Sequence, residues 1–214
     1  MEESKTKRVS GFVASRLEWL HNNPESSETK AALANMRRGV GKTPGEIPTL
    51  WGLLFDGFPE DLMGYGGTPS AAEWAVYTAL TLFAVHQQSK SLTDAFMSQN
   101  DMKFGKAVRL LVPAAKSEGD EFERIRRKFN IVATSADIRE LSHHMRGLIQ
   151  LLRGSSIPLD YPKLASDLYE WQFPDGLLRV RLNWGQDFYR ASTRETSDSS
   201  ENPSGPNSDS EHKE

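Results

Sequence analysis

Basic side chains gather in the second half of this 214-residue chain. Between residues 103 and 153 the sequence holds eleven Lys and Arg residues against six Asp and Glu residues. One group recurs at i, i+4, i+7, i+11 and i+14, a spacing that places its members on one face of an α-helix. Arginines seven positions apart lie about 10 Å apart along a helix axis, a span that one nucleic-acid strand can follow. The group consists of Arg139, His143, Arg146, Gln150 and Arg153.

Two shorter groups of cations precede that helix face. For any single residue, the stronger interpretation is a solvated helix surface, on which Glu123 pairs with Arg127 at i+4. Three basic helices in one half of a nearly neutral body nevertheless exceed what solubility requires. We therefore predict that the cluster as a whole contacts a phosphate backbone. The two groups are Lys106 with Arg109, and Arg124, Arg126, Arg127 with Lys128.

The segment at residues 37–43 reads RRGVGKT and raises the question of phosphate binding. A nucleotide-binding loop needs a glycine where Met36 stands, and Pro44 follows the motif directly, so we do not expect a nucleotide site. Two interpretations of the cations in this segment stay open: contact with a phosphate backbone, or stabilisation of the carboxyl end of a preceding helix. These cations are Arg37, Arg38 and Lys42.

The motif inventory gives no support for catalysis, a metal or a cofactor. His143 and His144 are adjacent, so on a helix they point about 100° apart and cannot chelate one ion together. The chain has no Gly-x-Ser-x-Gly or His-Glu-x-x-His motif. With no cysteine it also has no thiolate ligand and no cysteine nucleophile. A catalytic triad assembled from distant positions stays open.

Composition argues against a membrane protein. Charged residues make up 26% of the chain, and the longest apolar-rich run, residues 71–85, carries Glu73 and is too short to span a bilayer. The absence of cysteine fits a reducing compartment. The first ten residues begin with acidic side chains and contain no apolar core of a signal peptide. We therefore expect a cytoplasmic protein.

Charge and composition also divide the chain. Residues 192–214 hold six acidic and two basic residues, and the rest holds 23 acidic and 24 basic residues, which explains the net charge of −3. The same segment lacks Val, Ile, Leu, Met and aromatic residues, so it cannot bury enough apolar surface to fold. We assign residues 1–190 to a single helical domain, with two lobes split near residues 90–103 as an alternative. Residues 191–214 form a disordered acidic tail.

Hydrophobic periodicity predicts an all-α fold, a compact bundle of about eight or nine helices. Apolar residues at 47, 50, 51, 54 and 55 have helical spacing. Ser70 and Glu73 form a capping box before a helix that is apolar nearly all round, which places it at the centre. Residues 177–184 fit either a strand or a helix, and because a lone strand would have no partner, we predict a helix. Further helical patterns cover residues 104–111, 122–129, 138–152 and 161–171.

Tryptophan offers a second type of nucleic-acid contact, because bases stack on its ring. Each of the four candidates lies on an apolar stripe, so packing in the core is the stronger interpretation for all of them. They are Trp51, Trp74, Trp171 and Trp184.

The residues also resemble a known family as an ordered set. The series covers about residues 31–189 and occurs in the order seen in the CasB family, the small subunit of the type I-E CRISPR Cascade complex. That resemblance implies an all-helical subunit that is not an enzyme and carries no cofactor. The segments are NMRRGVGKTPGEIPTLWGLLF, FGKAVRLL, RIRRKF, HHMRGLIQLLR, IPLDYPKLASDLYEW and VRLNWGQDFY.

The resemblance further implies the partners. Two copies of such a subunit line an RNA-guided complex, beside its large subunit and its backbone subunits. There they contact guide RNA and the target and displaced DNA strands, and they help to hold the target open. A helical scaffold that binds only protein remains the alternative. The family's basic positions carry over to Arg37, Arg38, Arg126, Arg127 and Arg146, and more weakly to Lys106 and Arg109.

Overall fold

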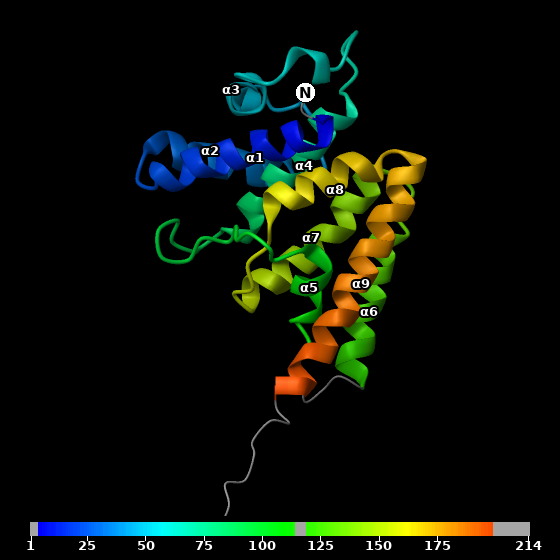
Figure 1. Ribbon diagram of the computed structural model, residues 1–214. Helices are drawn as coiled ribbons and strands as arrows, with labels where there is room; N and C mark the ends of the chain where they lie inside the picture. Colours follow the sequence, from blue (N-terminus) through cyan, green and yellow to red (C-terminus); the bar gives the residue numbers. More distant parts are fainter. Residues whose placement is uncertain (1–3, 114–118, 199–214) are drawn as a thin grey trace, which may run out of the picture.

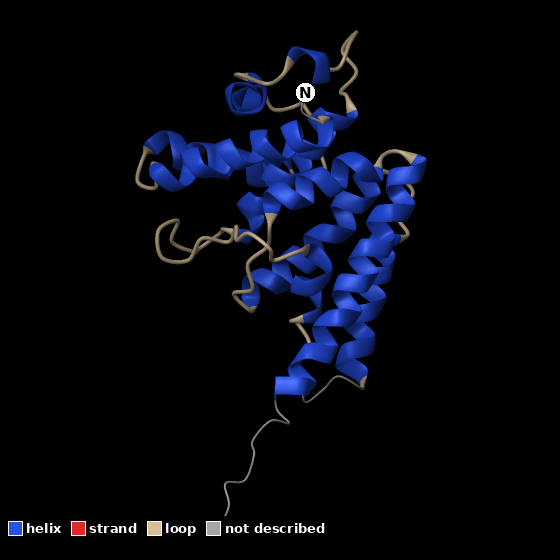
Figure 2. Ribbon diagram, in the orientation of Figure 1, coloured by secondary structure: helices blue, strands red, loops and turns tan. Residues whose placement is uncertain are grey.

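The computed structural model describes residues 4–113 and 119–198, with side chains described up to residue 190. Within these residues the fold is all-α, as predicted, and the only β pairings are two isolated bridges (Figures 1 and 2). The α-helices are α1 (Lys5–Asn22), α2 (Ser27–Gly39), α3 (Trp51–Phe55), α4 (Ala71–His86), α5 (Phe104–Arg109), α6 (Asp120–Ala133), α7 (Ile138–Gly154), α8 (Tyr161–Trp171) and α9 (Pro174–Asp198). Two 3-10 turns, Pro48–Leu50 and Glu60–Leu62, complete the described helices.

Helix α4 forms the centre of the bundle. Its predicted capping box is present, because Ser70 Oγ accepts from the Glu73 amide at 3.0 Å and the Glu73 carboxylate accepts from the Ser70 amide at 2.6 Å. Every residue from 75 to 86 is buried. Helices α1, α2, α7 and α8 pack around it, which is why its sequence is apolar nearly all round.

Helices α5, α6 and α9 extend to the lower end of the molecule in Figure 1, whereas α3 lies at the top. Helix α9 confirms the helical prediction for residues 177–184: Val180, Trp184 and Phe188 face inward at helical spacing. The backbone of α9 approaches α5 closely, since a Cβ atom added at Gly105 would lie 2.1 Å from the Trp184 carbonyl oxygen. Phe129 of α6 stacks on Phe188 with ring centroids 4.9 Å apart.

Helix α9 also runs beyond the boundary set from composition. It continues to Asp198, past residue 190, because extending an anchored helix costs little compared with nucleating one. The rest of the predicted tail, residues 199–214, lies outside the described residues.

Periodicity predicted two parts of the fold incorrectly or not at all, namely residues 47–55 and the first helix. The pattern at residues 47–55 gives a 3-10 turn from Pro48 and only a short α3, and Trp51 is 50% exposed. The helix expected before the RRGVGKT segment is confirmed by α2, whereas periodicity predicted no helix at α1, which buries Val9, Phe12 and Leu17 at helical spacing. None of the described helices combines the length and apolar character that a membrane span requires.

Candidate nucleic-acid interface

Lys42 and Arg139 lie where the loop after α2 approaches the start of α7, and Arg37 and Arg38 lie on the last turn of α2 that leads into this loop. We call this group the junction cluster; it comprises Arg37, Arg38, Lys42 and Arg139. The Arg139 guanidinium donates from Nη2 to Thr43 Oγ1 at 2.9 Å. It also lies over the Trp74 ring, with Cζ 5.3 Å from the ring centroid. A residue of α7 is thereby fixed against the loop that carries Lys42.

Local backbone geometry explains the loop. Helix α2 ends at Gly39, where the carbonyl accepts a hydrogen bond from the Tyr77 hydroxyl at 2.8 Å. A Cβ atom at that position would lie 2.6 Å from the Tyr77 oxygen, so only glycine allows this approach. Gly41, with φ of +83°, then turns the chain back. The Lys42 amide donates to the Gly39 carbonyl at 2.9 Å, which closes the turn.

The positive charge of the junction cluster is partly compensated by Glu46. The Thr43 amide, Lys42 and Arg139 together hold the pKa of the Glu46 carboxyl below its usual value. Lys42 Nζ lies 3.1 Å from Glu46 Oε1. Arg38 is exposed, whereas Arg37 is half-buried and its pKa is lowered by that burial. Lys42 and Arg139 are thus each held by an intramolecular partner, whereas Arg38 on the last turn of α2 is exposed.

The predicted surface stripe of α7 is present. Arg139, His143, Arg146 and Gln150 are exposed, while the apolar face of the same helix is buried. Arg153 differs, because it is half-buried and donates from Nη1 to Gln88 Oε1 at 2.8 Å and to the Val85 carbonyl at 3.5 Å. Arg153 therefore binds the carboxyl end of α4, where its positive charge stabilises the helix dipole.

The pair on α5 separates in the structure. Lys106 is exposed. Arg109 is only 2% exposed, and its Nη1 donates to the Val112 carbonyl at 2.9 Å. Its guanidinium also lies 5.8 Å from the Phe122 ring centroid. The expectation that Arg109 reaches a nucleic acid is corrected accordingly, because a buried side chain engaged by the protein cannot contact an external phosphate.

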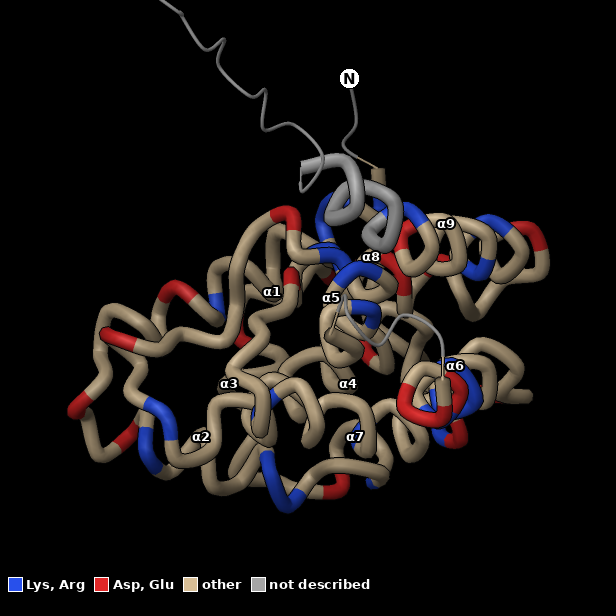
Figure 3. The backbone as a smooth tube through the Cα atoms, turned by 90° about the horizontal axis from the view of Figure 1, so that it is seen from below, with Lys and Arg blue, Asp and Glu red and all other residues tan. Residues whose placement is uncertain are grey.

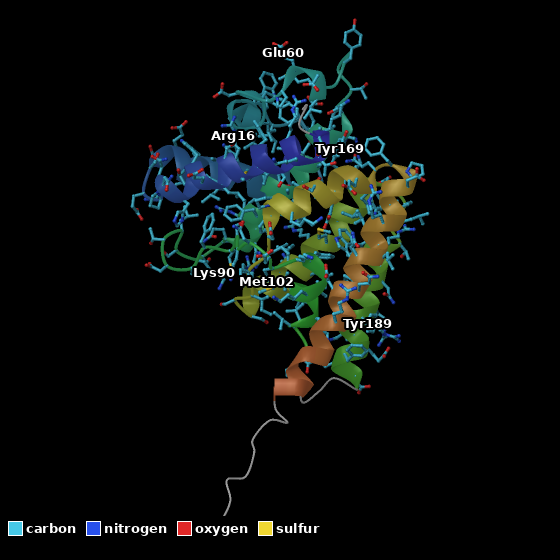
Figure 4. The ribbon with its side chains drawn as sticks, in the orientation of Figure 1. Arg16, Glu60, Lys90, Met102, Tyr169 and Tyr189 are labelled. Carbon is cyan, nitrogen blue, oxygen red and sulfur yellow. The ribbon has the colours of Figure 1, made fainter. Side chains whose placement is uncertain are left out.

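Helix α6 presents a mixed surface. Glu123 pairs with Arg126 at 2.6 Å, one position earlier than the expected i+4 partner. That pairing raises the pKa of Arg126. Arg127 is exposed and donates from Nε to the backbone carbonyl of Glu123 at 3.4 Å. Tyr189 lies on the neighbouring helix α9 and is labelled near the lower end of the molecule in Figure 4. Glu123 therefore forms its ion pair with Arg126 and not with Arg127, the predicted partner.

The basic side chains do not merge into one uninterrupted band. The junction cluster and the α7 stripe share Arg139, which is bonded to Thr43 of the loop after α2. Figure 3, which views the molecule from below, shows Lys and Arg positions on α5 and α9, and on α6 it shows them beside Asp and Glu. In the described chain, the recorded hydrogen bonds and ion pairs connect none of the α6 cations to the junction cluster. The structure therefore supports a junction surface and a separate α6 surface.

Other candidate chemistry is weak in the described residues. The rings of His143 and His144 lie 5.3 Å apart at an interplanar angle of 75°, and His144 Nε2 is 3.6 Å from Glu140 Oε1. The described ranges contain no group of three or more His, Cys, Asp or Glu residues placed to hold a metal ion. Nothing in this geometry resembles a nucleophile positioned against a base.

Periodicity assigned the wrong environment to one tryptophan. Trp171 and Trp184 are buried, as predicted. Trp74 is half-buried beneath Arg139. Trp51, in contrast, is half-exposed, because the 3-10 turn before α3 rotates it away from the core that Leu50 and Leu54 enter. Proline at position 48 was the only sequence signal of that rotation.

A family model described as CRISPR-associated protein Cse2 matches residues 32–189. The chain belongs to this family. It is 36% identical to CasB from Thermobifida fusca, whose crystal structure superposes with a TM-score of 0.70 over 85% of this chain and 98% of that chain. The resemblance to CasB is confirmed.

Two more distant structures share the fold. CasB from M. ruber is 21% identical, with a TM-score of 0.62 over 92% of this chain and 99% of its own. A chain of a structure described as a CRISPR RNA-guided surveillance complex is 19% identical, with a TM-score of 0.68 over 89% of this chain and 99% of its own. A search of curated proteins gave no match.

Proposed function

We propose that this Cse2-family protein is a non-catalytic small subunit of an RNA-guided CRISPR surveillance complex. In that complex it contacts the backbones of guide RNA and DNA strands and stabilises the opened target DNA. The observation that carries the proposal is the family match over residues 32–189, which spans nearly every helix of the bundle. The similarity to a chain of a surveillance complex adds support at the level of the fold.

The proposed nucleic-acid contact is made by the junction cluster and the exposed face of α7. Arginine suits this contact because its planar fork matches phosphate oxygens. In an RNA-guided complex the sequence is read by base pairing, so the protein needs backbone contacts and no base-edge code. The protein alone binds weakly, because Lys42 and Glu46 already form an ion pair. It gains affinity when a complex holds the strand beside it.

The proposed protein partners are a second copy of the chain, the large subunit and the backbone subunits of the complex. Helix α9 presents a surface of the kind that protein partners cover. Leu178, Leu182 and Tyr189 are 66%, 60% and 55% exposed and share one helix face at i, i+4 and i+11. Figure 4 labels Tyr189 on this helix.

One specific observation favours a second candidate, a helical scaffold that binds only protein. Arg126 is paired with Glu123 and Lys42 with Glu46, so intramolecular carboxylates neutralise part of both basic surfaces. In this alternative the remaining exposed arginines face acidic surfaces of neighbouring subunits.

A salt titration of the assembled complex separates the two candidates. Arg38→Ala and Arg146→Ala are compared with Lys30→Ala, which removes an exposed cation of α2 that is already paired with Glu25. Each lost phosphate contact is expected to reduce the slope of log K against log salt by about 0.7 for a single strand. An unchanged slope in the arginine variants, with normal assembly, supports the scaffold. Charge reversal at Arg126 and Arg127 tests the α6 surface in the same assay.

A further inference from the structure

Trp51 has an unusual position for a large aromatic residue. It opens α3, and half of its surface is exposed to solvent. Its indole N–H donates to the Gly45 carbonyl at 3.0 Å. That hydrogen bond holds one edge of the ring, so the ring is fixed in place while part of its surface stays open. An exposed tryptophan that is held in this way is suited to contact a flat partner.

A small pocket of about 250 Å³ lies beside the ring. Its size is below that of the pockets that hold drug-sized ligands, and it suits a single ring system. Glu73 is the only charged residue of its wall, and this carboxylate already accepts from the amides of Ser70 and Gly64. A phosphate would be repelled there, so the pocket favours a neutral planar group. The wall also includes Pro44, Phe55 and Pro69.

Cations stand next to this pocket. Gly45, which holds Trp51, is two residues from Thr43, which holds Arg139. Two residues of chain reach at most about 7 Å, so the bonded edges of Trp51 and Arg139 lie close together. Lys42 lies on the same loop and is exposed. A polyanion bound at these cations therefore runs beside the aromatic ring.

A second exposed aromatic residue lies at the rim. Tyr65 is 96% exposed at the tip of the turn that supplies Gly64, Gly67 and Thr68 to the pocket wall. The turn is closed by an isolated bridge between Tyr65 and Thr68. Gly66 and Gly67 adopt positive φ values of 62° and 78°, a conformation that favours glycine.

We propose that Trp51 is a stacking platform for one unpaired base of a single nucleic-acid strand whose phosphates lie along Lys42 and Arg139. The proposal rests on the nucleic-acid contact proposed above and adds a site for the base. Stacking on an aromatic ring is independent of sequence, because every base has a π face. The site therefore senses that a base is unpaired and leaves its identity to guide pairing.

The test uses the assembled complex and the full chain at low salt. The first probe is a single strand that carries 5-iodouracil, which crosslinks to a stacked aromatic ring on irradiation. The second is an abasic strand with the same number of phosphates. Trp51→Leu keeps apolar volume but removes the ring, and Trp51→Phe keeps a smaller ring. Phe173→Leu is the matched control, because Phe173 is 45% exposed and lies outside the proposed nucleic-acid and protein surfaces.

The expected result has three parts. Trp51→Leu weakens binding of the base-bearing strand by about fivefold or more, which corresponds to the stacking free energy of one base. It leaves the abasic strand unaffected, and Trp51→Phe retains most of the affinity. The crosslinked peptide contains Trp51 in the unsubstituted protein.

Two results overturn the proposal in distinguishable ways. If both strands bind the unsubstituted protein but Trp51→Leu changes neither, if Phe173→Leu weakens binding as much as Trp51→Leu, or if the adduct maps elsewhere, the stacking site is wrong and the backbone contact stands. If neither strand binds the unsubstituted complex, the backbone contact and the stacking site both fall. Should Trp51→Leu fail to fold, the adduct and the Trp51→Phe variant decide.

Discussion

Arg139 at the start of α7 donates a hydrogen bond to Thr43, 96 positions away in sequence, at 2.9 Å. The contact joins the predicted stripe of α7 to the glycine-rich loop after α2. It also fixes the guanidinium, which packs over the Trp74 ring. The same guanidinium helps to lower the pKa of the Glu46 carboxyl. The proposed interface is therefore partly organised before any nucleic acid binds.

A double-mutant cycle on Arg139→Ala and Thr43→Val measures this connection. Because the pair is near the surface, we expect a coupling free energy of about 1 kcal/mol or less, but different from zero. Urea unfolding of the four proteins gives the value. Strict additivity of the two single effects would show that the hydrogen bond does not organise the loop.

Gly105→Ala should destabilise the bundle by more than about 2 kcal/mol, because the new Cβ meets the Trp184 carbonyl oxygen and forces α5 from α9. Gly147→Ala on α7 is the matched control. Its Cβ would meet no atom within 4 Å, so we expect a gain of about 0.5–1 kcal/mol from helix propensity. Equal effects of the two changes in thermal unfolding would contradict the close packing of α5 on α9.

The two cations of α5 should behave in opposite ways. Arg109→Leu should lower stability, because it leaves the Val112 carbonyl without its donor in a buried place. It should leave the salt dependence of nucleic-acid binding unchanged. Lys106→Ala should leave stability nearly unchanged, since the side chain is exposed. A reduced salt slope in a folded Arg109 variant would restore that residue to the interface.

His86 should make the fold sensitive to acid. It is fully buried beside the Tyr161 hydroxyl, 3.0 Å from Nδ1, and burial lowers the pKa of its imidazole to about 4. An unfolded histidine titrates near 6.5, so below that pH the unfolded chain binds a proton that the folded chain excludes. Stability from this group is complete above the unfolded pKa and is lost as the pH falls toward 4, by roughly 2 kcal/mol between pH 7 and 5.

Urea unfolding of the unsubstituted protein and of His86→Asn at these two pH values measures the effect. The variant should lose less stability on acidification than the unsubstituted protein. The buried Asp167 opposes this trend, because burial raises the pKa of its carboxyl and protonation then favours the folded state. It is common to both proteins and cancels in the comparison. Parallel losses in the two proteins would exclude His86 as the source.

Local sequence rules succeeded where one stretch of chain fixes its own structure. The capping residue Ser70 marks the helix start that the structure shows, because its side chain accepts from a backbone amide within the first turn. The buried face of α7 follows from spacing alone. The rules failed at Trp51, where a 3-10 turn changed the rotation of the chain by less than the periodicity could detect.

The sequence by itself determined the all-α class, the central position of α4, the exposed stripe of α7 and the resemblance to CasB. These follow from hydrophobic period, caps and ordered motifs, which are local properties. Tertiary structure alone decided that Arg109 is buried, that Glu123 forms an ion pair with Arg126, and that Arg139 donates a hydrogen bond to Thr43. The reason is physical: a side chain's solvent and partners depend on the helices that pack against it, and sequence spacing on one helix carries no information about its neighbours.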